Sequence, residues 1–419
     1  MKTLSAIFLL FALTISVFAQ DAVTTLAGQA LVSGAANGNG TNALFSDPAA
    51  IIPDTNGNFF VADSQNHAIR KITTNGVVTT FVGQLGIFGS LNGTGTNARF
   101  NTPSGLAFDG SGNLFVADTG NSMIRKISPA GAVSTFAGIA GSSGFADGAA
   151  GGAQFDSPLG IAVATNGDVF VADSGNHCIR RISGGMVSTF AGSPQIWGSA
   201  DGTGTNAQFN GPVGLVFDAR GNLFVSDANN DTIRKVTTNG VVTTFTGAAG
   251  VDGTADGSLN VARFRSPAEL AFDKKGNLFV ADSFNQTVRE ILTNGIVSTV
   301  SGAAGISGTN SGVNGAGKFF NPYGLAVAED GSLLVADTYN ELVRVVLVPF
   351  KLSLQISGAN RVATISWDAV IGKNYQAQFT DDLTAAWTDL GAPVTATTLS
   401  LSVTDNSAGG LRVYRVLNE

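Results

Sequence analysis

VADSQNHAIRKI, residues 61–72, is the segment that decides the fold, because it returns five more times in the chain. The other copies are VADTGNSMIRKI (116–127), VADSGNHCIRRI (171–182), VSDANNDTIRKV (225–236), VADSFNQTVREI (280–291) and VADTYNELVRVV (335–346). Their aspartates stand at positions 63, 118, 173, 227, 282 and 337, so the steps between copies are 55, 55, 54, 55 and 55 residues. A fixed period of this size indicates a repeat architecture.

Each repeat contains four runs that are typical of β-strands. In the second repeat they are PSGLAFD (103–109), NLFVAD (113–118), MIRKIS (123–128) and AVSTFAG (132–138). The runs are short, rich in Val, Ile and Phe, and bounded by turn-forming Gly, Asn, Asp and Ser. Four antiparallel strands repeated radially make the blade of a β-propeller, and an open solenoid is the alternative.

The outer strand of the repeat is out of phase with the other three. Five copies of a VSTFAG-type run lie at 77–83, 132–138, 186–192, 241–247 and 296–302, and the last repeat lacks one. The sixth copy, AVTTLAG, stands at residues 22–28, before the first repeat. An open solenoid does not require this permutation. In a closed ring, the N-terminal strand completes the last blade, and the chain terminus is thereby held in a sheet. The sequence therefore predicts an all-β fold, a six-bladed β-propeller closed by the N-terminal strand.

The Asp-x-x-Asn-His-x-Ile-Arg pattern, clearest at Asp63–Arg70 and Asp173–Arg180, resembles NHL repeats, a family of six-bladed β-propellers. The resemblance covers residues 20–349 and suggests a protein of the secreted bacterial type. The first and third repeats carry the histidine, and the others replace it with Ser122, Asp231, Gln286 and Glu341. This departure suggests that the histidine is optional for the fold.

The repeated Asp, Asn and Arg residues fit a structural role, because one active site does not need six copies. An Asp at the end of a strand accepts backbone N–H groups of the following turn, and Asn tolerates left-handed backbone. We expect each Arg, on the third strand, to reach a carboxylate or carbonyl of a neighbouring blade. The single cysteine, Cys178, falls on the same strand and is expected to be buried.

The two histidines, His67 and His177, lie two blades apart. With strands ~4.8 Å apart, we expect a separation on the order of 20 Å, too far to share a metal ion. The NHL-type lyases that hold zinc through several histidines, and lactonases of related propeller shape, are therefore poor models for this chain.

The long segments between blades contain roughly ten residues beyond the usual blade length. Each ends with a Phe three residues before a Pro, and we expect this Phe to plug the segment onto the blade. The six are Phe45, Phe100, Phe155, Phe209, Phe264 and Phe319. Calcium binding by a loop such as Ala200–Asn206 is an alternative with few carboxylates to support it, and no other cofactor is expected.

The strands alternate in direction, so the long loops and the Asp-x-x-Asn turns are predicted to emerge on one face. Scaffolded loops concentrate binding residues, and the informative ones break the repeat. Aromatic residues do so at one loop position and at one turn position, and the histidines lie beside the turn. The predicted ligand-binding residues are Phe88, Trp197, His67, His177, Phe284 and Tyr339. The alternative is that these rings fill gaps between loops.

Residues 1–19 resemble a signal peptide, with Lys2 before an apolar run of about 15 residues and small residues at Val17 and Ala19. A membrane anchor is the alternative, although the run is short for spanning a bilayer. The sequence predicts a secreted, extracellular or periplasmic monomer without stable membrane insertion after cleavage. The net charge of −7 argues against nucleic acid as a partner.

The period stops after Pro349, and residues 350–419 predict a small β-sandwich with strands at 361–367, 374–380, 399–403 and 412–416. The segment resembles fibronectin-like domains through Trp367, Tyr375, Trp387 and Tyr414. Core packing is the expected role of these aromatic residues, and sugar binding is the alternative.

Two functions remain open at this point. The inner strands are apolar or small apart from Glu269, and a lone carboxylate is not a metal cage. This favours a secreted, non-catalytic binding or scaffold protein that presents its loop face to a protein or carbohydrate. The alternative is a propeller lyase or lactonase-type hydrolase with a metal at the axis.

Overall fold

A computed structural model describes residues 14–18, 22–313, 316–347, 351–357, 362–368, 374–380, 388–397, 400–406 and 413–418. The chain divides into two compact units. One comprises residues 21–347, and the other combines residues 1–20 with 348–419. In the described part of the chain, no helix is long and apolar enough to cross a membrane.

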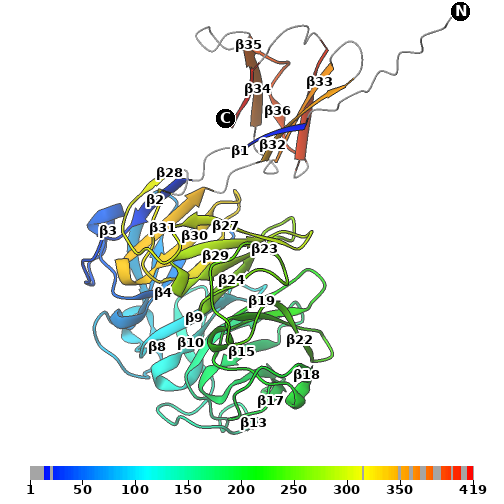
Figure 1. Ribbon diagram of the computed structural model, residues 1–419. Coiled ribbons are helices and arrows are strands. Elements are labelled where there is room, and N and C mark those ends of the chain that lie inside the picture. Colours follow the sequence, from blue (N-terminus) through cyan, green and yellow to red (C-terminus); the bar gives the residue numbers. More distant parts are fainter. Residues whose placement is uncertain are drawn as a thin grey trace, which may run out of the picture. The chain divides into compact units, whose positions relative to one another are not determined.

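The first unit contains six antiparallel sheets of five strands, which we number blade one to blade six along the chain (Figure 1). Blade two runs from the innermost strand outward as β9 (Pro103–Phe108), β10 (Leu114–Asp118), β11 (Met123–Ile127), β12 (Ala132–Ala137) and β8 (Gly93–Thr94). The first four strands are those that the sequence predicts. The fifth, β8, has two residues and comes from the long segment that precedes the blade.

The remaining blades repeat this order. Blade one has β4 (Pro48–Pro53), β5 (Phe59–Asp63), β6 (Ala68–Ile72), β7 (Val77–Val82) and β3 (Gly38–Asn39). Blade three has β14 (Pro158–Val163), β15 (Val169–Asp173), β16 (Cys178–Ser183), β17 (Met186–Ala191) and β13 (Gly148–Ala149). Blade four has β19 (Pro212–Phe217), β20 (Leu223–Asp227), β21 (Thr232–Val236), β22 (Val241–Gly247) and β18 (Gly202–Thr203). Blade five has β24 (Pro267–Phe272), β25 (Leu278–Asp282), β26 (Thr287–Ile291), β27 (Ile296–Gly302) and β23 (Gly257–Ser258).

Blade six combines strands from both ends of the repeat region. Its strands are β29 (Pro322–Val327), β30 (Leu333–Asp337), β31 (Leu342–Leu347), β2 (Ala22–Ala27) and β28 (Gly312–Val313). The N-terminal β2 pairs antiparallel with β31, with Thr25 opposite Arg344 (Figure 1). The Thr338 hydroxyl of blade six also donates to the Pro48 carbonyl of blade one, at 2.8 Å. Blade six therefore lies against blade one.

Short 3₁₀ helices mark the turns. Six of them follow the repeated Asp, namely η2 (Ser64–Asn66), η4 (Thr119–Asn121), η5 (Ser174–Asn176), η7 (Ala228–Asn230), η8 (Ser283–Asn285) and η9 (Thr338–Asn340). Three more lie in the long segments, namely η1 (Gly40–Asn42), η3 (Gly95–Asn97) and η6 (Gly204–Asn206).

The core lies between consecutive blades. Phe60 and Ile69 of blade one, for example, share a buried cluster with Leu106 and Leu114 of blade two. The inner strands approach so closely that a side chain at Gly160 would collide with the backbone carbonyl of Val213 in the next blade. This contact explains why the third inner-strand position is glycine in four blades.

The second unit contains two four-stranded sheets. One is β1 (Thr14–Phe18), β32 (Lys351–Ser357), β33 (Val362–Asp368) and β37 (Ser400–Asp405). The other is β35 (Thr388–Asp389), β34 (Asn374–Thr380) and β36 (Val394–Thr395), with β38 (Val413–Asn418) paired to β34. The four predicted strands are confirmed, within two residues at each end. Strand β1 falls within the segment predicted as a signal peptide, and cleavage after Ala19 would remove it from its sheet.

Two aromatic residues of the second unit pack in its interior. Trp367 and Tyr375 are buried, and their ring centroids lie 6.2 Å apart. The expected core role is therefore confirmed for these two. Trp387 lies outside the described residues, and so does the side chain of Tyr414.

Candidate functional site

The repeated Asp, Asn and Arg of each blade form one buried network. In blade one, Arg70 and Asp63 are fully buried, and Arg70 Nη1 donates to Asp63 Oδ2 at 2.6 Å. The same oxygen accepts from Asn66 Nδ2 at 2.9 Å, and Asp63 Oδ1 accepts from the Ser46 backbone N–H at 2.8 Å. Both oxygens of this carboxylate are therefore hydrogen-bonded inside the fold.

Each Arg binds its own blade, which corrects the expectation that it reaches a neighbouring one. Arg70 Nη2 donates to Ala36 O and to Asn37 Oδ1, both at 2.8 Å. These acceptors precede β3, the outermost strand of the same blade. Because the segment comes directly from the previous blade, the guanidinium fixes it onto the sheet that it has just joined.

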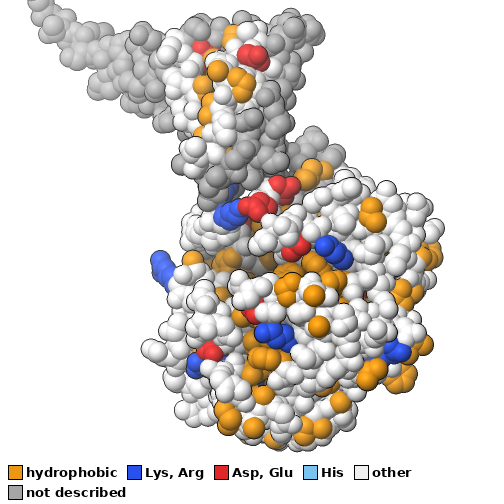
Figure 2. Space-filling model, turned by 180° about the vertical axis from the view of Figure 1, so that it is seen from behind, with side chains coloured by type: hydrophobic (Ala, Val, Ile, Leu, Met, Phe, Trp, Pro, Cys, Tyr) orange, Lys and Arg blue, Asp and Glu red, His pale blue; other side chains and the backbone are white. Residues whose placement is uncertain are grey.

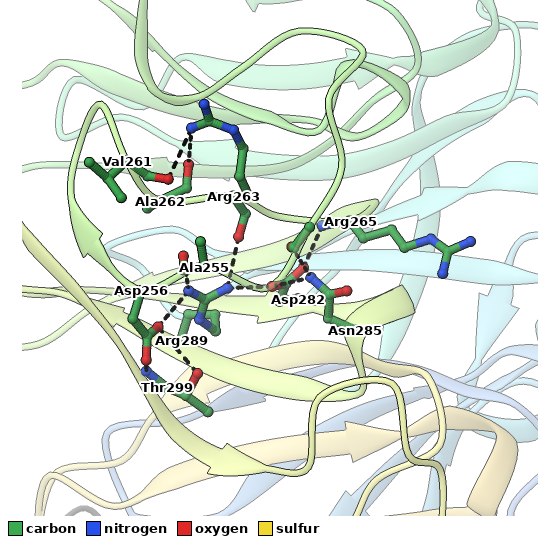
Figure 3. Close-up of polar contacts among 11 residues, drawn as sticks. Ala255, Asp256, Val261, Ala262, Arg263, Arg265, Asp282, Asn285, Arg289 and Thr299 are labelled. Carbon is green, nitrogen blue, oxygen red and sulfur yellow. Dashed lines mark hydrogen bonds and ion pairs between the residues drawn. The ribbon is translucent and has the colours of Figure 1, made fainter.

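Figure 3 shows the same network in blade five. Arg289 donates to Asp282 Oδ2 at 2.8 Å and to Asp256 Oδ1 at 2.6 Å. The equivalent loop carboxylate in blade four, Asp201, lies 2.8 Å from Arg234 Nη2. The carboxylate in the proposed calcium loop Ala200–Asn206 thus already has a cationic partner.

The repeated Phe completes the network from the other side. All six rings are fully buried, which confirms that they plug the long segments. Each lies under the guanidinium of its blade, as Phe100 does under Arg125 with 5.1 Å to the ring centroid. Buried cation–π contacts of this kind stabilise the charge of an Arg that has no water around it.

The buried aspartates are not acid–base groups. Burial raises the pKa of Asp63 to about 6, while Arg70 and the Ser46 N–H oppose that rise. The carboxylate therefore stays ionised at neutral pH and is held by its ion pair. The other five aspartates have the same partners, so the same ion-paired network stabilises each of the six blades.

The histidines turn out to join neighbouring blades. His67 follows η2 in the left-handed region, with φ of 56°, and its Nδ1 accepts the backbone N–H of Thr102 in blade two at 3.1 Å. His177 does the same with the N–H of Gly211 in blade four, also at 3.1 Å. An accepting Nδ1 places the proton on Nε2, and burial lowers the pKa of both imidazoles.

Other acceptors replace the histidine in three further blades. Asp231 Oδ1 accepts from Ser266 N at 2.8 Å, Gln286 Oε1 from Asn321 N at 2.6 Å, and Glu341 Oε2 from Asp47 N at 2.7 Å. We call these contacts the inter-blade latches. In the described part of the chain, Ser122 is the member of the set that makes no such bond. Five of the six blades thus place a side-chain hydrogen-bond acceptor at this position, and that acceptor need not be histidine.

The donor of every latch has an unusual backbone. The residue before each inner-strand proline has positive φ, for example 45° at Thr102 and 49° at Asp47. This conformation is disfavoured for a residue with a side chain, and proline restricts its predecessor further. The latches hold these strained residues in place between blades.

Loop tips and turns lie together on one face. The Gly86 N–H of a long loop donates to Asn66 O of η2, and Leu31 N–H donates to Asn340 O of η9. The same contact recurs in the other blades. We call this surface the loop face.

The predicted ligand-binding rings are exposed on this face. The exposed fraction is 68% for both Phe88 and Trp197, 52% for Phe284 and 47% for Tyr339. Phe88 packs edge-on against His67, with centroids 5.9 Å apart. Among the described residues no ring contact joins the four aromatic residues to one another. The structure therefore pairs Phe88 with His67 but distributes the others over separate blades.

The molecular surface is poor in charge. Figure 2 shows groups of hydrophobic side chains on the propeller, separated by uncharged surface with few Lys, Arg, Asp or Glu. Exposed aliphatic residues contribute beside the rings, including Ile87 and Ile196 on the long loops. Scattered apolar side chains are common on soluble proteins, and a large contiguous patch is what indicates a binding surface.

A narrow recess lies on the propeller axis. It is lined by all six inner strands, through Ala49, Ala50, Ser104, Gly105, Leu159, Gly160, Val213, Glu269 and Tyr323. These residues directly follow the prolines that end the long segments, so the recess lies at the loop-face end of the axis. The space between these residues is far narrower than the roughly 300–1,000 Å³ of most small-molecule sites.

Two polar side chains enter this recess. Glu269 occupies the position that is glycine in four blades, and its carboxyl lies near the backbone N–H groups of Leu270 and Leu215. Burial raises the pKa of Glu269 to about 8, so the group is protonated at neutral pH. Burial and the nearby Glu269 raise the pKa of Tyr323 above its usual value.

The sequence identified Glu269 as the polar exception on the axis but missed Tyr323. The signal was present, because Tyr323 stands where the other inner strands have Ala, Ser, Leu, Val and Ala. Cys178 is buried as expected. Within the part of the chain that the structure describes, no three His, Cys, Asp or Glu side chains are grouped to hold a metal ion.

Comparison with known proteins agrees with this architecture. Residues 100–127 and 155–182 match the NHL repeat. NHL repeat-containing protein 2 of Homo sapiens is 29% identical over 328 residues, which cover 70% of this chain and 45% of that protein. The chain therefore spans less than half the length of this relative.

Solved structures resemble the chain at low sequence identity. A Bacteroides thetaiotaomicron protein of unknown function has a TM-score of 0.62 and 21% identity, covering 79% of this chain and 76% of that one. An auxiliary nutrient binding protein of the same species has 0.60 and 13%, with 78% and 77% covered. A streptogramin B lyase has 0.50 and 13%, with 78% and 98% covered. Together these matches support an NHL-repeat β-propeller.

Proposed function

We propose that this chain is a secreted, non-catalytic binding or scaffold protein whose loop face engages a protein or carbohydrate. One observation carries the proposal, namely the contrast between buried repeated residues and exposed residues that break the repeat. Arg70 and Asp63 are 0% exposed, whereas Phe88 and Trp197 are 68% exposed. The charged residues of the repeat are buried and paired with one another inside the fold. Exposed rings on scaffolded loops, in contrast, are suited to recognition.

The finer architecture belongs to the same proposal. We infer a closed ring of six blades with β2 as the outer strand of blade six, supported by the pairing of β2 with β31 and the bond from Thr338 to Pro48. The second unit would form a small fibronectin-like sandwich around Trp367 and Tyr375. A monomer secreted through cleavage of residues 1–19, extracellular or periplasmic, completes the proposal. Calcium in the long loops stays a secondary proposal.

The structural neighbours are compatible with binding. One is named an auxiliary nutrient binding protein and another a streptogramin B lyase, and at 13% identity both support the fold alone. The proposal therefore depends on the loop face of this chain.

A direct test removes the exposed rings together. The variant with Phe88, Trp197, Phe284 and Tyr339 all changed to Ser is expected to unfold like the parent protein but to lose binding on glycan and cell-surface protein arrays. The matched control changes Met186, which is exposed on an outer strand, to Ser. Array binding that is unchanged in the quadruple variant would contradict the proposal.

An enzyme of the lyase or lactonase type is the second candidate, and Glu269 with Tyr323 on the axis is the observation that favours it. A protonated carboxylic acid beside a phenol provides a proton donor in a narrow recess. The described residues place one carboxylate there, whereas a metal cage needs several ligands. Metal analysis of the purified protein separates the two functions, because stoichiometric metal at the axis would favour the enzyme.

A further inference from the structure

The loop face is not uniform around the axis, because aromatic residues gather where blades five and six meet the recess. Tyr323 lies on β29 inside the recess, and Tyr339 lies on η9 of the same blade. Phe284 holds the equivalent turn position on η8 of blade five. Blades one to four have Gln65, Gly120, Gly175 and Asn229 at this turn position.

Four of these residues lie close together, and we call them, with Phe284 on the equivalent turn of the neighbouring blade, the axial mouth (Glu269, Phe284, Phe320, Tyr323 and Tyr339). Tyr339 packs edge-on against Phe320 with centroids 5.2 Å apart. Tyr323 lies close enough to Glu269 and Tyr339 for both to raise its pKa. Tyr339 and Phe284 are about half exposed, so their rings remain open to a ligand.

The base of the mouth offers hydrogen bonds without a fixed charge. No hydrogen bond to the Tyr323 hydroxyl is found within the described part of the chain, although the residue lines the recess. A buried or half-buried phenol normally finds a partner. Beside it, Glu269 is protonated at neutral pH, because burial raises its pKa to about 8.

We propose that the axial mouth binds one neutral sugar ring of an oligosaccharide, stacked on Tyr339, with a hydroxyl group directed to Tyr323 and Glu269. The inference rests on the proposed function and names the site and the ligand class. An aromatic ring stacks against the apolar C–H face of a sugar, and the O–H groups at the base donate hydrogen bonds to its hydroxyl oxygens.

Charge and size both favour such a ligand. Acidic groups, Asp47 and Glu341, occupy the junction of blades six and one beside the mouth. The nearby cation Arg265 is already paired with Asp252 at 3.2 Å. The acidic groups beside the mouth and the pairing of Arg265 therefore disfavour an anionic ligand. The recess is too narrow to admit a sugar ring, so the ring itself would rest on Tyr339 at the mouth, with one hydroxyl group directed toward the recess.

The test uses the mature protein and four immobilised neutral probes, maltohexaose, cellohexaose, mannohexaose and xylohexaose. Heparin and choline serve as anionic and cationic probes. We expect at least one neutral probe to bind, and Tyr339→Ala to weaken it about tenfold. Tyr323→Phe keeps the ring and removes the hydroxyl, and we expect it to weaken binding about threefold to tenfold. Met186→Ala, on an outer strand, should leave the affinity unchanged.

The outcomes separate this inference from the proposed function. If Phe88→Ala or Trp197→Ala abolishes binding of a neutral probe while Tyr339→Ala does not, the loop face still binds but the site assignment is wrong. Preferential binding of heparin or choline, or failure of every neutral probe, overturns the ligand class. If the quadruple Ser variant also keeps all its array partners, the proposed function fails as well. Unfolding curves of each variant exclude loss of fold as the cause.

Discussion

The buried network of blade two and the axial mouth of blades five and six use the repeat in opposite ways. In blade two, Arg125 and Asp118 satisfy one another and are closed to solvent. At the mouth, Glu269 and Tyr323 replace small or aliphatic residues of the repeat, line a narrow recess and are partly exposed. Residues that repeat in every blade therefore build the frame of this chain, whereas residues that interrupt the repeat supply the surface available for function.

The largest loss of stability is expected from removing one charge of the buried network. Arg125→Met leaves Asp118 buried without its cation, and we expect a loss of roughly 3–5 kcal/mol in the free energy of unfolding. Adding Asp118→Asn should recover part of that loss, because the unpaired charge disappears. Urea unfolding measures both, and a loss below about 1 kcal/mol in the single variant would contradict the structural role.

A smaller effect is expected where the inner strands touch. Gly160→Ala places a methyl group against the Val213 carbonyl of the next blade, and overpacking of this kind costs about 1–3 kcal/mol. Gly110→Ala is the matched control, because its methyl group would meet no atom within 4 Å. Equal stability of the two variants would show that the blades are not packed as described.

The inter-blade latch predicts a loss of about 1 kcal/mol for His67→Ala, which removes the acceptor of the Thr102 N–H. His67→Gln should keep most of the stability, because Gln286 provides the same bond in blade five. If the Gln variant is as unstable as the Ala variant, the imidazole has a role beyond accepting this bond.

The pH dependence of stability tests the same histidine contacts. Burial lowers the pKa of His67 and His177 from 6.5, so the unfolded chain takes up protons first as the pH falls. The stability that depends on neutral imidazoles is present above the unfolded pKa and is lost as the pH falls through the folded pKa. We expect the double variant His67→Gln/His177→Gln to lose less stability than the parent between about pH 7.5 and pH 5. A larger loss in the variant would reverse the sign and refute the assignment.

The smallest effect on stability is expected at the exposed rings. Phe88→Ala and Trp197→Ala should change the free energy of unfolding by less than about 0.5 kcal/mol, because both side chains are mostly in solvent. Thermal unfolding checks this. A loss above about 1 kcal/mol would support the alternative that these rings fill gaps between loops.

Much of the frame was predictable because it repeats. The four strands of each blade, the buried Phe plugs and buried Cys178 follow from spacing and composition alone. The two-residue strand β8 did not, since Gly93–Thr94 has no strand pattern and joins the sheet through the loop that Arg125 holds. The Arg partners were assigned to the wrong blade, because sequence cannot show which sheet a long segment joins.

The candidate site was predicted less completely. The sequence showed that His67 varies among repeats, but not that His, Asp, Gln and Glu share an acceptor atom at the same reach. That equivalence appears when Nδ1, Oδ1, Oε1 and Oε2 are seen to meet the same N–H. Tyr323 was missed because an aromatic residue on an inner strand is expected to be a buried core residue, and only the structure shows that it lines the recess.

Hydrogen–deuterium exchange of the mature protein, with and without saturating neutral hexasaccharide, shows directly whether the loop face binds the ligand. We expect slower exchange of the segments at the loop face, above all residues 264–286 and 319–341. Protection confined to outer strands such as β17, with the loop face unchanged, would contradict it.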